Sequence, residues 1–294
     1  MKRIAKFILI LLVVALSTGF VAQKIDYRDG RYMNVCKALS GDALVYCIFV
    51  DTRETKPWSD FDIRTTVDSM RVATQWLNEQ AKKNNVQLKI KSDYFIGDEF
   101  ATIRKNLPMG DVYKSVTEPN MKTGVYELNK WANNVAKRAG MTLNIVPKDG
   151  IPDITNPKDK ERFVAYLRDE YNVESVALLF MVNNYYKTDI SISLNTLNTN
   201  DVEFAIISYK YPSEIAHNFL HLYGAADMYE TPYRRNDRKI QILQNLYPKE
   251  IMQDPYAKNI WELEISNYTK YLIGWSNSLD PDFEDLLTDK SLSF

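Results

Sequence analysis

The sequence predicts an α/β (or α+β) protein with one twisted, mixed sheet, in a single domain that covers residues 23–294. Segments of β character alternate with segments of helical periodicity, and no internal repeat or clean linker separates them. Hydrophobic residues make up 45% of the 294 residues and charged residues 26%, which is ordinary globular composition. The 37 basic and 38 acidic side chains nearly balance, so there is no electrostatic reason to expect a nucleic-acid partner.

The elements of the first half follow from local patterns. Residues 43–52 (ALVYCIFVDT) are apolar and rich in β-branched and aromatic side chains, which predicts a buried strand. Residues 60–85 carry apolar side chains at helical spacing and end in lysines and asparagines, which predicts a helix. Residues 86–96 alternate between polar and apolar types, like a half-buried strand. A second helix is expected over residues 117–139, ending at Gly140.

In the second half, residues 145–159 are rich in Pro, Gly and Asp and predict a loop, after which residues 160–172 predict a short helix. Three further strands are expected over residues 173–184, 189–195 and 202–211. Another helix should begin after Pro212, and a last one should cover about residues 260–274.

Residues 1–22 have the layout of a secretory signal peptide. Basic residues precede an apolar run over residues 7–16, and small residues follow, which predicts cleavage after Ala22 or, alternatively, after Gly19. The apolar run is shorter than the roughly 20 residues of a membrane span. We therefore expect a secreted or periplasmic protein with no stable membrane span after cleavage, and an uncleaved N-terminal anchor is the alternative.

The two cysteines, Cys36 and Cys47, lie close together in the sequence. An oxidising compartment would favour a disulfide between them, and closing so short a loop is sterically easy. Two buried free thiols are the alternative, because cysteine packs like a small hydrophobic residue. In either case their role is structural.

The only two histidines, His217 and His221, are four residues apart in the helix that follows Pro212. This spacing puts them on one helical face, where two imidazoles can bind one tetrahedral cation. Gly224 predicts a left-handed turn that leads the chain back toward the metal, so Asp227 can supply a carboxylate as the third ligand. Ser213 is the expected N-cap of the helix.

Two alternatives to this ligand set remain open. Glu262 or Glu264, from the last predicted helix, could supply the third ligand instead of Asp227. The histidines could also lie on an ordinary helix that binds no metal.

The full pattern, H-N-F-L-H-L-Y-G-A-A-D, resembles the H-E-x-x-H-x-x-G-x-x-H/D motif of the metzincin zinc peptidases. Met252, in the turn-like stretch YPKEIMQDPY, resembles the methionine turn that underlies the zinc site in that family. The motif resemblance covers residues 213–256 and the architectural one about 43–275. It implies a zincin-like fold with an active-site helix and a C-terminal helix, Zn²⁺ as cofactor, and a polypeptide substrate or binding partner in the cleft.

Asn218 departs from the family pattern at the position of the catalytic glutamate. That glutamate acts as general base toward the metal-bound water, whereas an amide cannot accept the proton. We therefore expect an exported zinc-binding, metallopeptidase-like protein, a pseudoenzyme with impaired or lost activity. The alternatives are an active zinc endopeptidase that uses Glu214 as base, and a metal-free binding or structural domain.

Overall fold

The computed structural model describes residues 36, 38–53, 55–96, 102–108, 121–145, 154, 156–183, 190–194, 202–208, 210–229 and 238–287. The expected signal peptide, residues 1–22, lies outside these ranges. Within them the chain forms six α-helices and a six-stranded mixed sheet, which confirms the α/β class. None of the helices described is both long enough and apolar enough to cross a membrane.

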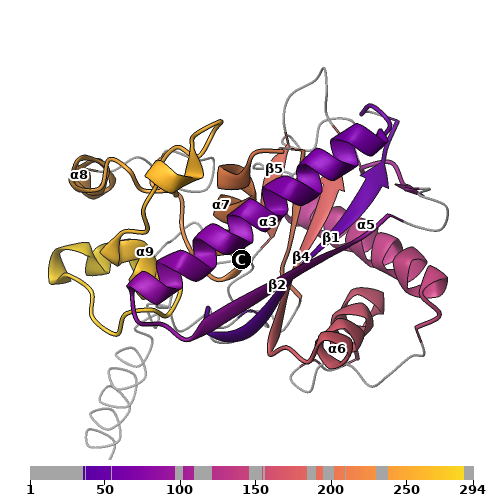
Figure 1. Cartoon of the computed structure of the whole chain (residues 1–294), viewed down its shortest axis with the longest axis horizontal. Coiled ribbons are helices and arrows are strands. Elements are labelled where there is room, and N and C mark those ends of the chain that lie inside the picture. Colours follow the sequence, from indigo (N-terminus) through magenta and orange to yellow (C-terminus); the bar gives the residue numbers. More distant parts are fainter. Residues whose placement is uncertain are drawn as a thin grey trace, which may run out of the picture.

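The sheet has the strand order β2-β1-β4-β6-β5, and the short strand β3 pairs with the end of β1 (Figure 1). All neighbouring strands are parallel except β5, the edge strand, which runs antiparallel to β6. The strands are β1 (Gly41–Asp51), β2 (Leu88–Phe95), β3 (Ile103–Arg104), β4 (Ser175–Val182), β5 (Ser191–Leu194) and β6 (Phe204–Ile207).

Helices cover both faces of the sheet, with α3 crossing one face and α5 and α6 on the other (Figure 1). Alternate residues of β1 belong to two different cores: Val45 and Phe49 pack with α3 and α7, whereas Tyr46 and Ile48 pack with α5 and α6. Burial on both faces explains why β1 and β4 read as nearly continuous apolar runs. The helices are α3 (Asp60–Lys83), α5 (Met121–Thr142), α6 (Asp159–Tyr171), α7 (Pro212–Leu222), α8 (Arg238–Leu246) and α9 (Asn267–Leu272).

The expected C-terminal helix over residues 260–274 is wrong in its extent. The chain forms a 3₁₀ turn, η2 (Ile260–Glu262), then an extended stretch, and only then α9. The break has two causes: the backbone of Glu264 pairs with that of Glu250, and the side chain of Ser266 caps α9 by accepting from Thr269 N. The helices α8 and η3 (Pro281–Leu287) and the strand β3 were not anticipated.

The expected end of the second helix at Gly140 is also wrong. Helix α5 continues through Gly140 to Thr142, and the left-handed residue that follows it is Asn144, with φ 51°. Asparagine tolerates this conformation better than most non-glycine residues, because its short polar side chain can hydrogen-bond locally.

Cys36 and Cys47 are free thiols, both buried, so the structure contains no disulfide between them. The Cys36 Sγ donates to the carbonyl oxygen of Val176 on β4 (3.4 Å), whereas the Cys47 Sγ lies 3.1 Å from Met70 Sδ on α3. The two thiols therefore face different neighbours, and burial raises the pKa of the Cys47 thiol. They pack as small apolar groups, as in the alternative considered above.

Candidate metal centre

Helix α7 carries both histidines and begins directly after the chain leaves β6. Its N-cap is Tyr211, with Pro212 in the first turn, so the prediction that Ser213 is the N-cap is wrong. Proline suits the first helical position because it has no N–H group to satisfy there. Ser213 instead donates its hydroxyl to the carbonyl oxygen of Pro255 (2.6 Å), which ties the start of the helix to a distant segment.

The helix ends in the left-handed turn that was predicted at Gly224. Gly224 has φ 96°, and its N–H donates to the carbonyl of His221 (2.9 Å). The next amide, Ala225 N, donates to Leu220 O (3.0 Å). A side chain at this φ would be strained, so glycine allows the chain to turn back here. The turn brings Asp227 beside the two histidines.

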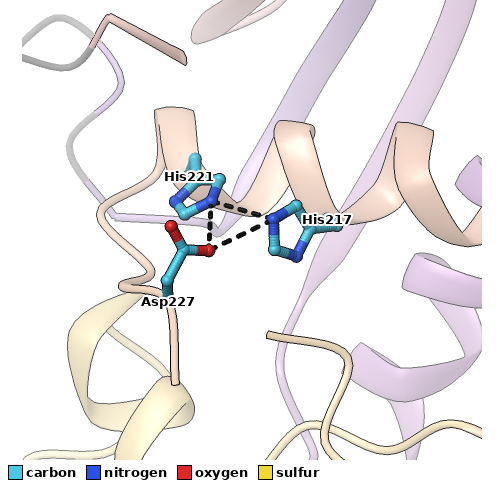
Figure 2. A group of neighbouring side chains, drawn as sticks. All are labelled: His217, His221 and Asp227. Carbon is cyan, nitrogen blue, oxygen red and sulfur yellow. Dashed lines mark hydrogen bonds and ion pairs between the residues drawn. The ribbon is translucent and has the colours of Figure 1, made fainter. Parts of the chain in front are cut away.

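His217, His221 and Asp227 form a compact triangle of ligand atoms (Figure 2). The two Nε2 atoms are 3.0 Å apart, and the Asp227 Oδ1 lies 3.3 Å from His217 Nε2 and 3.0 Å from His221 Nε2. The exposed fractions of the three side chains are 4%, 16% and 19%, respectively. The structure thus brings together all three residues that the sequence nominated.

Backbone carbonyls fix the orientation of both imidazole rings. The Nδ1 of His217 lies 3.1 Å from Ile251 O, and the Nδ1 of His221 lies 2.9 Å from Ala225 O. A carbonyl oxygen can only accept a hydrogen bond, so each Nδ1 is the donor and carries the hydrogen. In the neutral rings both Nε2 atoms therefore keep their lone pairs, and these lone pairs point at each other and at a carboxylate oxygen.

The electrostatics of the triangle follow from its burial. Burial, followed by the charge of His221, lowers the pKa of His217. Burial opposes ionisation of Asp227 as well, but the positive charge that His221 carries when protonated outweighs it and holds the pKa of Asp227 well below its usual range. Burial would lower the pKa of His221, yet the charge of Asp227 raises it. The site thus holds an ionised carboxylate that attracts positive charge.

The donor set and its dimensions fit a tetrahedral zinc ion. Zinc bonds to histidine nitrogen and carboxylate oxygen are about 2.0–2.2 Å long, so ligand atoms on a tetrahedron lie about 3.3 Å apart. The separations of 3.0–3.3 Å in the triangle are close to that value. The Nδ1–H bonds to backbone carbonyls are also the usual outer contacts of histidine ligands.

Met252 lies in a turn, as expected for this segment, and its side chain is fully buried. The turn supports the site through its backbone: Ile251 O accepts from His217 Nδ1, and Met252 O accepts from the N–H of Met228 (2.9 Å), the residue after Asp227. The carbonyl groups of two consecutive residues thereby hold two of the three ligand segments.

Asn218 is buried and makes three hydrogen bonds through its side chain. Its Oδ1 accepts from the hydroxyls of Ser191 (3.0 Å) and Ser193 (3.1 Å) on β5, and its Nδ2 donates to Glu214 O (2.9 Å). The two serines were missed in the sequence. Their i, i+2 spacing in a short predicted strand was the available signal, because such residues share one face.

The alternative ligands are not part of the cluster. Among the described residues, only His217, His221 and Asp227 form a group of this kind, with ligand atoms within 4.8 Å of one another. Glu262 and Glu264, the alternative third ligands, are exposed, whereas Glu214, which was considered as an alternative base, is buried in the first turn of α7. Asp227 is therefore the acidic member of the site.

Comparisons with known proteins leave the chain without an assigned family. No protein-family model matches it, and no curated protein is significantly similar to it. Any functional statement therefore depends on the chemistry of the site.

Proposed function

We propose that this protein binds one zinc ion through His217 Nε2, His221 Nε2 and Asp227 Oδ1. The observation that carries the proposal is the convergence of two imidazole Nε2 atoms, whose rings carry their hydrogens on Nδ1, with one carboxylate oxygen. Two lone pairs and an ionised carboxylate at 3.0–3.3 Å repel one another unless a cation or added protons lie between them. A zinc ion satisfies all three at once.

The chemistry of such a site would be that of a zinc hydrolase that lacks the general base, the group that takes a proton from the metal-bound water. Zinc held by three protein ligands lowers the pKa of a bound water and polarises a carbonyl group. Asn218 stands where the base would be and cannot take a proton, and loss of a general base typically costs about 10²–10⁴ in rate. We infer a metallopeptidase-like pseudoenzyme that retains metal binding and lacks efficient hydrolysis.

Three features support kinship with the metzincin peptidases, which remains part of the proposal. The motif in α7 and the turn after it matches in its histidines, glycine and third acidic ligand. The turn at Met252 lies against the site, and the fold has a mixed sheet with a site helix and a short helix near the C-terminus. Export through residues 1–22 and a polypeptide partner at the site belong to the same proposal.

Zinc content tests the proposal directly. The purified mature protein should contain about one zinc per chain by elemental analysis. Asp227→Ala should reduce that content strongly, whereas Asp254→Ala, which alters an exposed aspartate paired with Lys258, should not. A chain that takes up no zinc, or that holds it equally well after Asp227→Ala, would contradict the assignment and favour a metal-free binding or structural role.

A further inference from the structure

The carboxyl group of Glu250 is buried although glutamate usually lies in water. Glu250 is 2% exposed, and its side chain accepts hydrogen bonds only from uncharged donors. Oε1 accepts from Met252 N (3.3 Å) and from the Thr269 hydroxyl (3.1 Å), and Oε2 accepts from Ser266 N. A buried carboxylate is costly unless such bonds compensate for lost water, so this arrangement needs a structural or functional reason.

The bonds of Glu250 connect two segments that are separate in the sequence. Ser266 is the N-cap of α9 and Thr269 lies in its first turn, whereas Met252 belongs to the turn under the site. The backbone strengthens this link, because Ile251 N donates to Glu264 O (3.0 Å) and Glu264 N donates to Lys249 O (2.8 Å). The turn is thus held from two sides by the chain that leads into α9.

The same turn holds the metal ligands from its other side. The carbonyl oxygen of Ile251 receives the Nδ1–H of His217, and the carbonyl oxygen of Met252 receives the N–H of Met228, next to Asp227. Both carbonyls belong to the two residues that directly follow Glu250. A shift of this turn would therefore move His217 and Asp227 relative to His221, whose own anchor is Ala225 O within the α7 turn.

We propose that Glu250 is a positioning residue for the metal centre. Its carboxylate fixes the turn at residues 250–252 against α9, and this turn then sets the orientation of His217 and the position of Asp227. This inference rests on the zinc site proposed above and extends it to a residue that touches no ligand. It makes α9 part of the support of the site through its contacts with Glu250.

The test compares Glu-to-Gln changes at two residues, Glu250 and Glu264, whose backbones pair with each other. Glu250→Gln keeps the shape but replaces one acceptor oxygen with an NH₂ group that faces a donor. Glu264→Gln is the matched control, because Glu264 pairs with Glu250 through the backbone but has an exposed side chain. Zinc affinity, measured by competition with a chelating dye, should fall about 10–100-fold in Glu250→Gln, as is typical for lost outer-shell contacts, and stay unchanged in Glu264→Gln.

A spectroscopic readout separates positioning from a general loss of stability. With Co²⁺ in place of zinc, the visible absorption bands report the coordination geometry, and they should change in Glu250→Gln but not in Glu264→Gln. Thr269→Val removes one donor to Glu250 with little change of shape, and it should shift affinity in the same direction by a smaller factor. This variant decides the matter if Glu250→Gln fails to fold.

The outcomes are distinguishable. Wild-type protein that binds neither Zn²⁺ nor Co²⁺ would refute the zinc site itself. Wild-type binding together with unchanged affinity and unchanged Co²⁺ spectra in Glu250→Gln would overturn the positioning role while leaving the zinc site intact. If Glu250→Gln does not fold, unchanged affinity in Thr269→Val would overturn it as well.

Discussion

At the scale of single residues, Asn218 connects the site helix to the edge strand. Its amide bridges Ser191 and Ser193 on β5 to the backbone of α7. A glutamate at this position could still accept from the two serine hydroxyls and would add a group that can take a proton. The asparagine is hydrogen-bonded within the surrounding fold, and at the proposed zinc site its consequence would be the lack of a general base.

We predict that Asn218→Glu raises peptide hydrolysis by zinc-loaded protein by about 10²-fold or more, since a general base is typically worth about 10²–10⁴. Cleavage of a quenched fluorescent peptide library would measure the gain. Asn218→Gln is the matched control, with the length of glutamate but no basic group. Equal hydrolysis rates in the two variants would argue against the role assigned to residue 218. If the wild type is already active and Glu214→Gln abolishes that activity, Glu214 is the base.

The cysteines allow a second prediction at this scale. Because Cys36 and Cys47 are buried and unbonded, both thiols should resist alkylation in the native protein and react without reductant once it is unfolded. Mass spectrometry after iodoacetamide treatment would count two added groups. A chain that gains none until a reductant is added would show that the cysteines form a disulfide.

At the scale of elements, the turn after α7 determines whether Asp227 reaches the histidines. Gly224 has φ 96°, where an L-residue is strained by roughly 1–2 kcal/mol. We predict that Gly224→Ala lowers the free energy of unfolding of the metal-free protein by about that amount and weakens zinc binding. Urea unfolding and zinc titration would measure the two effects. Gly140→Ala, in the helical part of α5, is the control and should not weaken zinc binding.

The buried carboxyl of Glu250 predicts a pH effect on the metal-free protein. Burial raises the pKa of Glu250 above its ordinary value of 4.5, although hydrogen bonds from Ser266, Met252 and Thr269 oppose the rise. The folded state then binds this proton more tightly than the unfolded state does. The contribution of Glu250 to the free energy of unfolding therefore decreases as the pH rises from about 4.5 through the raised pKa.

Glu250→Gln cannot ionise, so its unfolding free energy should fall less steeply than that of the wild type over this pH interval. Urea unfolding at several pH values, with a chelator present, would compare the two slopes. Parallel curves would mean that Glu250 ionises with an unshifted pKa. The Glu264→Gln variant, whose side chain is exposed, should follow the wild type.

Much of this organisation could be predicted from the sequence, and the exceptions have identifiable causes. The strands β1 and β4 were recognisable because burial on both faces requires an apolar run. The site residues were recognisable because helical spacing and a glycine turn are local signals, which point to His217, His221 and Asp227. The break before α9 could not be predicted, because it depends on backbone pairing between Glu264 and Glu250, which lies earlier in the chain. The roles of the Ile251 and Ala225 carbonyl groups could not be predicted either, since every residue type has a carbonyl oxygen.

At the scale of the whole molecule, the site joins segments from different parts of the chain. The proposed ligands come from α7 and the turn after it, and their support comes from the turn at Met252 and, through Glu250, from α9. A metal ion bound there by the folded state alone should stabilise the folded protein as a whole.

We predict that zinc at 100 times its dissociation constant stabilises the folded protein by about 2.7 kcal/mol. For a chain of this size the melting temperature should rise by about 5–10 °C, and the rise should disappear with a chelator or in Asp227→Ala. Thermal unfolding followed by circular dichroism would measure it. Equal shifts in wild type and Asp227→Ala would point to binding elsewhere on the protein.

The topology of the sheet affects how soon the chain can fold. The central pair joins β1 to β4, so Ala43 meets Ser175 only after most of the chain has been made. Loop-closure entropy makes such distant parallel pairing slow, so we expect the sheet to close later than the local helices form. Under the proposed export through residues 1–22, this delay would leave time for translocation before the centre of the sheet closes.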